Sequence, residues 1–187
     1  MIICPICSNN THTIGKIDLN KSCLDTFKKR IFPISDTTIE YVECNSCGFV
    51  FSPEMCNWTK GKFAKLIYNK EYFKVDPHYC SIRPIRNKEY LHYIFEKIPL
   101  SHLDYGGGSG ILSKALHNGG WNSETYDPFY DNKLPTTKFD LITLFEVVEH
   151  HPEPNELIND LNKLSGNKSV IIFSTSVSDK IANPINW

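Results

Sequence analysis

Residues 103–110 read Leu-Asp-Tyr-Gly-Gly-Gly-Ser-Gly and place four glycines within five consecutive positions. Glycine loops of this kind allow the backbone to approach a ligand very closely. The short apolar run around Leu103 predicts a strand that ends at Asp104, and a helix face is predicted after the loop from Ile111, Leu112, Ala115 and Leu116. The order strand, loop, helix is typical of nucleotide-binding α/β folds.

The spacing of these glycines excludes two phosphate-binding patterns. A P-loop requires a Gly-Lys pair followed by Ser or Thr, and the chain contains no such triplet. A dinucleotide fingerprint that starts at Gly106 and Gly108 requires a third glycine where this chain has Ile111. What remains is an acidic residue followed by alternating glycines, Asp104-x-Gly106-x-Gly108-x-Gly110. Taken alone, this pattern also fits a tight turn without a ligand.

Two further features follow the loop. Asp127 ends the next predicted strand, residues 121–127, and lies 23 residues beyond Asp104. Residues 138–150, Lys-Phe-Asp-Leu-Ile-Thr-Leu-Phe-Glu-Val-Val-Glu-His, contain a continuous apolar run. Such a run suits a parallel strand that is buried on both faces.

From about residue 86 to residue 176 the chain resembles the class I S-adenosylmethionine-dependent methyltransferases. Their first motif has the form of the glycine loop, and residues 138–150 look like their fourth strand and the loop after it. Pro152 and Pro154 open a predicted helix that Gly166 ends, and residues 169–174 supply a fifth strand. The resemblance implies an α/β fold with a Rossmann-like, mostly parallel sheet, and S-adenosylmethionine as cofactor.

The resemblance also implies roles for individual residues. Asp127 would accept hydrogen bonds from both ribose hydroxyls. Pro128 and Phe129 would face the adenine, and Phe145 would lie near the reactive methyl group. The expected cofactor-binding residues are Asp104, Tyr105, Gly106, Gly107, Gly108, Gly110, Asp127, Pro128, Phe129 and Phe145.

Glu146, Glu149 and His150 are the expected catalytic residues. Glu149 and His150 would orient or deprotonate an acceptor hydroxyl or carbon acid, a role that suits histidine near neutral pH, and Glu146 would lie near the methyl group. The pattern also resembles ubiquinone-pathway O-methyltransferases, in which the corresponding residues hold a divalent cation. Alternatively, His150 only packs against or caps the next helix. His151, next to Pro152, is expected to face solvent.

The chain departs from the family pattern in two places. Only 11 residues separate Asp127 from Phe139, too few for the usual helix and third strand, so we expect an abbreviated adenine side of the pocket. The sequence stops at Trp187, where the family adds two more strands. We therefore expect a sheet truncated after the fifth strand. Either the chain is a fragment, or a partner such as a second copy covers the exposed edge.

Two Cys-x-x-C pairs, Cys4 with Cys7 and Cys44 with Cys47, indicate a metal site near the N-terminus. Four thiolates form a closed tetrahedral site for structural zinc, which predicts a small zinc-ribbon module. The alternating residues 38–43 predict the strand that delivers the second pair. Buried or redox-active thiols are the alternative, but a redox pair normally occurs once beside a βαβ pattern.

Composition indicates a globular protein, with 41% hydrophobic and 22% charged residues. Neither a signal peptide nor an apolar run of membrane-spanning length is present, so we expect a cytoplasmic protein without a membrane partner. The expected division is a zinc-ribbon module over residues 1–52, a helical and aromatic linker over 53–85 and a methyltransferase domain over 86–187. The linker aromatics are expected to pack the module against the domain, and Arg83 is expected to be solvated.

The leading functional hypothesis is methyl transfer to a small-molecule acceptor of the sugar or natural-product type. RNA methylation is the first alternative, since zinc ribbons often bind nucleic acid. A net charge of −1 and the lack of an interleaved arginine and aromatic run argue against it. A non-catalytic remnant of the methyltransferase fold is the second alternative.

Overall fold

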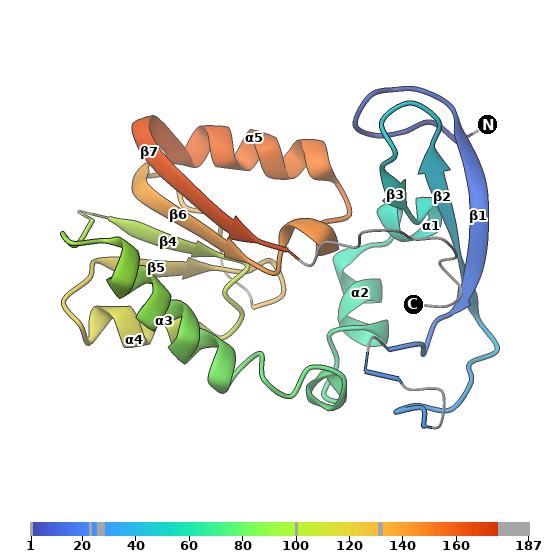
Figure 1. Ribbon diagram of the computed structural model, residues 1–187, viewed down its shortest axis with the longest axis horizontal. Helices are drawn as coiled ribbons and strands as arrows, with labels where there is room; N and C mark the ends of the chain where they lie inside the picture. Colours follow the sequence, from blue (N-terminus) through green and yellow to red (C-terminus); the bar gives the residue numbers. More distant parts are fainter. Residues whose placement is uncertain (1, 23, 26–28, 100, 131–132, 176–187) are drawn as a thin grey trace.

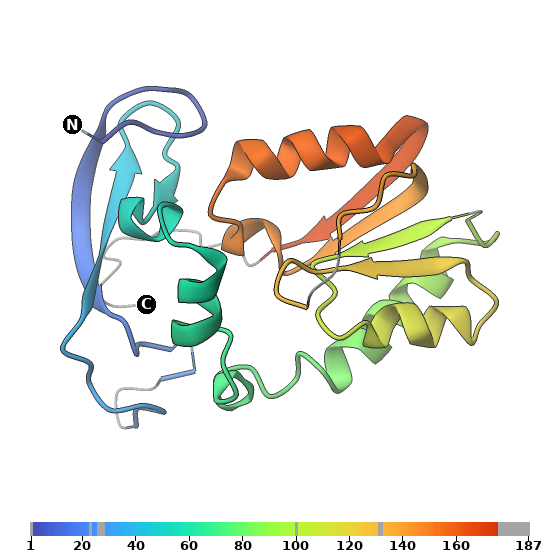
Figure 2. The same ribbon diagram turned by 180° about the vertical axis from the view of Figure 1, so that it is seen from behind.

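The computed structural model describes residues 2–22, 24–25, 29–99, 101–130 and 133–175. Two sheets, one at each end of the molecule, are joined by a helical segment (Figure 1). The strands of the larger sheet point toward this segment and toward the smaller sheet, as the view from behind also shows (Figure 2). None of the helices in the described residues has both the length and the apolar character that crossing a membrane requires.

The smaller sheet is antiparallel and comes from the N-terminal part of the chain. Its strands, in the order β1-β2-β3, are β1 (Thr11–Asp18), β2 (Thr38–Cys44) and β3 (Val50–Phe51). The strand predicted over residues 38–43 is therefore confirmed. Thr11 pairs with Cys44, so the start of β1 lies beside the end of β2. This register brings the two cysteine pairs to the same end of the sheet.

Short helices connect the two sheets: α1 (Pro53–Cys56), α2 (Lys60–Leu66) and the 3₁₀ helix η1 (Tyr72–Lys74). Hydroxyl caps fix where the first two begin, because Ser52 Oγ accepts from Met55 N at 3.3 Å and Thr59 Oγ1 accepts from Lys62 N at 3.2 Å. Their apolar side chains pack on the small sheet in a cluster with Ile39, Trp58 and Phe63 at its centre.

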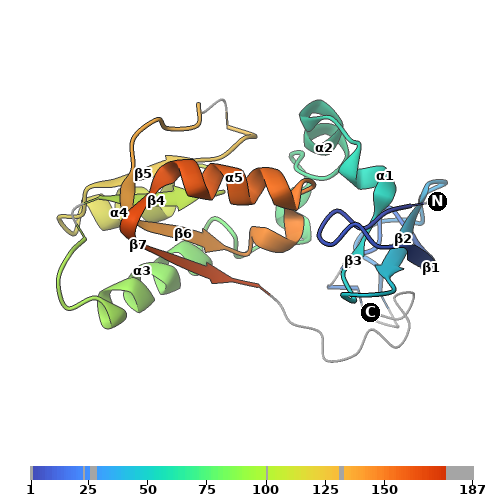
Figure 3. The same ribbon diagram turned by 90° about the horizontal axis from the view of Figure 1, so that it is seen from above.

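The larger sheet has four parallel strands in the order β5-β4-β6-β7. Their bounds are β4 (His102–Tyr105), β5 (Ser123–Tyr126), β6 (Phe139–Phe145) and β7 (Ser165–Ser174). Helices α3 (Ile82–Ile94) and α4 (Ile111–His117) cover one face, and α5 (Pro154–Leu164) covers the other (Figures 1 and 3). This three-layer arrangement confirms the predicted α/β class with a Rossmann-like sheet.

Strand β6 lies in the centre of the core. Ile142 and Leu144 belong to the cluster under α5, whereas Leu141 belongs to the cluster under α3 and α4. All three side chains are at most 1% exposed. The prediction that this continuous apolar run forms a strand buried on both faces is therefore confirmed.

The segment from α5 onward differs from its prediction in one detail. The helix ends at Leu164 and β7 begins at once with Ser165, so Gly166 lies inside the strand and does not end the helix. Among the described residues β7 is an edge strand, and Val170, Ile171 and Phe173 are 46%, 42% and 60% exposed. That a second copy covers this edge stays a prediction, and the final residues 183–187 lie outside the described part.

Candidate active site and metal centre

The glycine loop joins β4 to α4, and its conformation requires glycine. Gly106, Gly108 and Gly110 have φ of +75°, +58° and +75°, a left-handed conformation that side chains rarely tolerate. At Gly107 the constraint is space, since a Cβ there would lie 2.2 Å from Asp104 Oδ2. Gly110 is the residue that caps the N-terminus of α4. The loop therefore brings bare backbone to the carboxyl end of β4.

Asp127, at the end of β5, ties two loops together. Its Oδ2 accepts from Gly108 N at 2.9 Å, and its Oδ1 accepts from Phe129 N at 2.8 Å. The residue is only 8% exposed, and burial raises the pKa of its carboxyl. The carboxylate thus orders the glycine loop, and its oxygens are acceptors that suit hydrogen bonds from ribose hydroxyls.

A buried polar network lies beneath the loop. Thr143 Oγ1 donates to Asp104 Oδ1 at 3.1 Å, and His102 Nε2 lies 3.0 Å from the same hydroxyl. The other ring nitrogen, His102 Nδ1, lies 2.7 Å from Ser123 Oγ. When Asp104 is ionised it can only accept, so Thr143 donates to it and His102 donates to Thr143 through Nε2. The network crosses β5, β4 and β6 and fixes the side chain of Asp104.

A cavity of about 570 Å³ lies where β4, β5 and β6 end. Its volume is within the range of small-molecule sites. Strand β4 lies between β5 and β6, so the chain continues to one side of β4 and then to the other. In α/β sheets, ligands bind at such a topological switch point. Nine of the expected cofactor-binding residues line the cavity: Asp104, Tyr105, Gly106, Gly107, Gly108, Asp127, Pro128, Phe129 and Phe145. Gly110 is outside this lining.

Comparison with known families identifies the family of the domain that contains this cavity. A family model described as a methyltransferase domain matches residues 79–187, more than half of the chain. The chain belongs to this family. Membership implies an S-adenosylmethionine-dependent methyltransferase, as the resemblance in the glycine loop and β6 predicted. A comparison with curated proteins finds no match.

The fit of the methyltransferase cofactor to these residues follows from the loop itself. Side chains at Gly106 and Gly107 would collide with Val147 at 2.6 Å and with Asp104 at 2.2 Å, so bare backbone faces the cavity there. Backbone without side chains and a buried carboxylate suit a ligand that approaches closely and carries ribose hydroxyls. The roles assigned to single residues remain predictions.

Glu146 follows β6 in an unusual backbone conformation. Its φ is +57°, which for a residue with a side chain costs about 1 kcal/mol. Ser174, at the end of β7, holds it there: Glu146 N donates to Ser174 O at 3.1 Å, and Ser174 Oγ donates to Glu146 Oε1 at 2.8 Å. Glu146 lines the cavity of the methyltransferase. Strain that is maintained at a cavity wall is typical of functional positions.

Of the two neighbouring histidines, only His151 differs from its prediction. His150, in the 3₁₀ helix η2 (Val148–His150), is exposed and lines the cavity, whereas Glu149 is exposed and outside the cavity lining. The prediction that His151 faces solvent is wrong, because His151 is half-buried and also lines the cavity. Its Nδ1 accepts from Glu153 N at 3.2 Å, and burial lowers the pKa of the ring. Neutral His151 therefore carries its proton on Nε2.

The cation hypothesis for Glu146, Glu149 and His150 gains no support from their positions. Within the part of the chain that the structure describes, the N-terminal cysteines alone form a cluster of converging metal ligands. The methyltransferase does not bring these three side chains together as a preformed ligand set.

One wall of the cavity was not predicted from the sequence. It comes from the linking segment, residues 52–81 between β3 and α3. Its lining residues are Trp58, Lys60, Phe63, Ala64, Tyr68, Asn69, Lys70, Tyr72, Asp76, Tyr79 and Cys80, joined by Arg83, Pro84 and Asn87 from α3. The expected packing role of the aromatics is also present, since the rings of Phe63 and Tyr68 lie 6.3 Å and 4.7 Å from that of Phe129. Arg83 is not simply solvated: it forms two hydrogen bonds with Asp76, at 2.9 Å and 3.0 Å.

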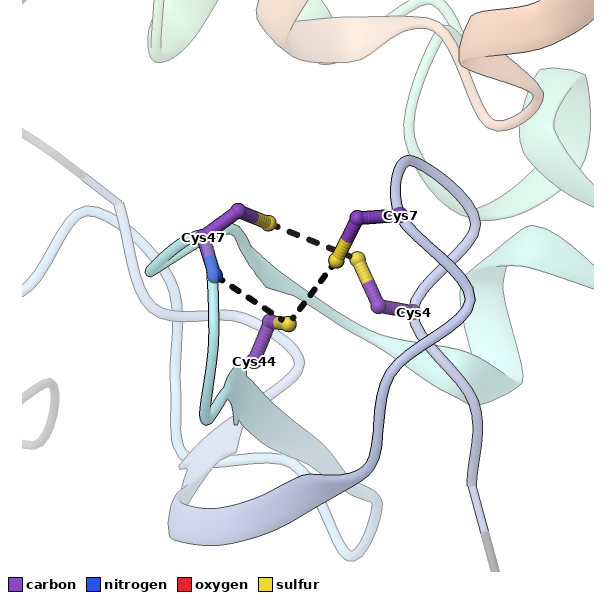
Figure 4. Close-up of side chains that lie close together, drawn as sticks. All are labelled: Cys4, Cys7, Cys44 and Cys47. Atoms are coloured by element: carbon purple, nitrogen blue, oxygen red, sulfur yellow. Dashed lines mark hydrogen bonds between the residues drawn. The ribbon is translucent and has the colours of Figure 1, made fainter.

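The four predicted metal ligands converge. The Sγ atoms of Cys4, Cys7, Cys44 and Cys47 all lie within 4.8 Å of one another (Figure 4). Two of the distances are 3.7 Å, between Cys4 and Cys47, and 3.4 Å, between Cys7 and Cys44. A tetrahedral ion with metal–sulfur bonds of about 2.3 Å would separate its sulfurs by about 3.8 Å. Both the donor set and the spacing fit such an ion.

The two cysteine pairs lie in matching turns. Ser8 N donates to Cys4 O at 3.0 Å, and Gly48 N donates to Cys44 O at 3.1 Å. Both donors have positive φ, +58° and +72°. In each turn a backbone N–H also donates to the first sulfur, from Ile6 to Cys4 Sγ and from Ser46 to Cys44 Sγ, both at 3.4 Å. These donors suit thiolates, so the geometry of the turns fits metal ligation.

Proposed function

We propose that this methyltransferase transfers its methyl group to a small molecule that binds in the cavity between the linking segment and the larger sheet. The observation that carries the proposal is the composition of the cavity wall. Among the described residues, the wall contains six acidic side chains, Asp76, Asp104, Asp127, Glu146, Glu156 and Asp160, and three obligate cations, Lys60, Lys70 and Arg83.

This charge balance favours a small acceptor over RNA. Nucleic-acid affinity comes largely from cations that neutralise phosphates. One of the three cations, Arg83, is already paired with Asp76. A wall with excess carboxylates repels a polyphosphate but accepts hydrogen bonds from hydroxyl and amino groups. A hydroxylated acceptor, such as a sugar or a natural product, suits such a wall.

S-Adenosylmethionine, when bound, supplies an electrophilic methyl group. Asp127 and the backbone of residues 106–108 would hold the cofactor. Glu146 would orient the acceptor, and the imidazole of His150 would take the proton that an acceptor hydroxyl loses. His151 would donate from Nε2 to an acceptor oxygen, because its Nδ1 is engaged by Glu153 N. Alignment and exclusion of water are the main contributions of such a site.

We further propose that the ion held by Cys4, Cys7, Cys44 and Cys47 is structural zinc. Four thiolates leave no open coordination position for chemistry. The module that the ion would stabilise contacts α5, the helix on one face of the larger sheet, since Asn155 Nδ2 donates to Pro5 O at 2.8 Å.

Binding and transfer assays test the proposal. The first is calorimetry of the full chain with S-adenosylhomocysteine; the second follows label from methyl-labelled S-adenosylmethionine into hydroxylated small molecules or total RNA. We expect micromolar binding, label in the small molecules and none in RNA. Asp127→Asn should weaken binding by about tenfold or more, because one of its two backbone partners loses an acceptor. Glu124→Gln, an exposed change on the same strand, is the matched control.

Other outcomes would support the alternatives. Labelled RNA, with RNA affinity that falls steeply as salt rises, would establish the nucleic-acid alternative. Absence of binding to either form of the cofactor would indicate a non-catalytic remnant.

A further inference from the structure

The methyltransferase domain has little of its own structure on the Asp127 side of the cavity. Between Tyr126 and Phe139 the described residues contain no helix or strand. Strand β5 is accordingly the edge of the larger sheet on this side, within the described part of the chain. A wall is nevertheless needed here, because a ligand held by the Asp127 carboxylate would otherwise lie against solvent.

The linking segment supplies that wall. Tyr68 lies 4.7 Å from Phe129, and Tyr72 lies 5.2 Å from Tyr68, measured between ring centroids. Tyr79 continues the series, 5.3 Å from Tyr72. All of these rings line the cavity. The aromatic wall, Tyr68, Tyr72, Tyr79 and Phe129, therefore spans the two parts of the chain.

Tyr68 is the tyrosine of this wall that packs on Phe129, the residue whose N–H donates to Asp127. Burial raises the pKa of its hydroxyl, and the charges of Tyr72, Asp127 and Glu149 add to the effect. The phenol consequently stays protonated and can donate a hydrogen bond near the Asp127 carboxylate. Asp127 itself already receives N–H groups from Gly108 and Phe129. A flat ring with a hydroxyl at its edge thus lines the same cavity as the group expected to hold a ribose.

We propose that Tyr68 is a cofactor-binding residue, with its ring against the adenosine half of S-adenosylmethionine and its hydroxyl toward the ribose. The linking segment then completes the cofactor site, in addition to packing against the methyltransferase domain. This inference rests on the proposed function of the same cavity. The alternative is that Tyr68 only packs the linking segment against Phe129.

Two variants and two probes distinguish these possibilities. Tyr68→Phe removes the hydroxyl and keeps the ring, whereas Tyr68→Leu removes the ring. Calorimetry of each full-length variant uses S-adenosylhomocysteine and methylthioadenosine, which shares the adenosine half but lacks the amino-acid part. Tyr93→Phe is the matched control, because Tyr93 is 86% exposed on α3 and outside the cavity lining.

We expect Tyr68→Leu to weaken both probes by about tenfold, as for loss of one base–aromatic stack. Tyr68→Phe should weaken both by about fivefold, the effect of one hydrogen bond. Tyr93→Phe should change neither. Unchanged affinity for both probes in Tyr68→Leu, with thermal unfolding showing a folded protein, would overturn the inference.

If Tyr68→Leu does not fold, Tyr68→Phe decides: a loss of affinity supports the inference, and wild-type affinity overturns it. Failure of the wild-type protein to bind S-adenosylhomocysteine would instead refute the proposed function, so the two failures are distinguishable.

Discussion

The rings of Tyr68 and Phe129 lie 4.7 Å apart, although the two residues belong to different parts of the chain. Phe129 follows β5 in the methyltransferase domain, and its side chain packs against the cluster centred on Ile39, Trp58 and Phe63. The same side chain was predicted to face adenine. Its position gives it a second role, because it anchors the catalytic domain to the N-terminal module.

Replacement of this anchor should destabilise the whole protein. Phe129→Ala removes a partly buried ring, and we expect it to lower the free energy of unfolding by about 2 kcal/mol. Urea unfolding followed by tryptophan fluorescence measures this. Phe73→Ala is the control, because Phe73 is 53% exposed and its truncation should change stability by less than about 0.5 kcal/mol. Equal losses for the two variants would contradict the anchoring role.

Replacement of two different glycines by alanine should change the stability of the protein in opposite directions. Gly107→Ala puts a methyl group 2.2 Å from Asp104 Oδ2, so we expect a destabilisation of about 2 kcal/mol or more and loss of cofactor binding. Gly61→Ala lies in helix α2, where the nearest atom to the new Cβ is 3.9 Å away. It should stabilise the protein by about 0.5 kcal/mol. Thermal unfolding with and without S-adenosylhomocysteine measures both effects, and a neutral Gly107→Ala would refute the steric argument.

Zinc should stabilise the N-terminal module. We expect about one equivalent of bound zinc in protein purified without chelators, and Cys7→Ser should lose it. Loss of the ion should cost about 3 kcal/mol of stability, seen as a fall of about 10 °C in the thermal midpoint. Cys80→Ser is the control, since Cys80 is exposed and outside the four-sulfur cluster. Full zinc content in Cys7→Ser would exclude this cysteine as a ligand.

The sequence predicts those parts of the site where one physical requirement dictates both the residue type and its spacing. The glycine loop is an example, because the left-handed conformation of Gly106 and the crowding at Gly107 exclude side chains. The cysteine pairs are another, since each Cys-x-x-C turn presents two sulfurs by itself. Strand β6 is a third, because burial on both faces requires a continuous apolar run.

The parts that the sequence did not predict depend on contacts between distant segments. His102 and Thr143 are isolated polar residues in apolar strands, and only the alignment of β4 with β6 joins them to Asp104. The position of Tyr68 in the cavity wall could not be predicted, because it depends on the contact of its ring with Phe129, a residue far along the chain. His151 was expected in solvent because a proline follows it, but the turn that this proline makes directs Glu153 N back to its ring.

The buried network around Asp104 predicts a pH dependence of stability. Burial raises the pKa of the Asp104 carboxyl to about 7, whereas an unfolded aspartate has a pKa of about 3.9. Between these values the folded protein retains a proton that the unfolded chain has lost. The contribution of Asp104 to stability is therefore full below about pH 4 and is lost as the pH rises through about 7.

Comparison with Asp104→Asn isolates this effect, because the amide does not titrate. We expect the stability of the wild-type protein relative to Asp104→Asn to fall from pH 5.5 to pH 7.5, by at most about 1.4 kcal/mol per pH unit. Burial lowers the pKa of His102 to about 4. Below the ordinary histidine pKa of about 6.5 the unfolded chain therefore binds a proton that the folded protein does not, so this residue makes stability rise with pH over part of the range. Because both proteins contain His102, its contribution cancels in the difference.

Urea unfolding at several pH values within this range measures the difference. Asp36→Asn is the control, since Asp36 is exposed and should leave the wild-type pH profile unchanged. The range stays above pH 5 so that protonation of the cysteine ligands does not release the metal. Parallel profiles for the wild-type protein and Asp104→Asn would mean that Asp104 is ionised throughout, and that the hydrogen bond from Thr143 outweighs its burial.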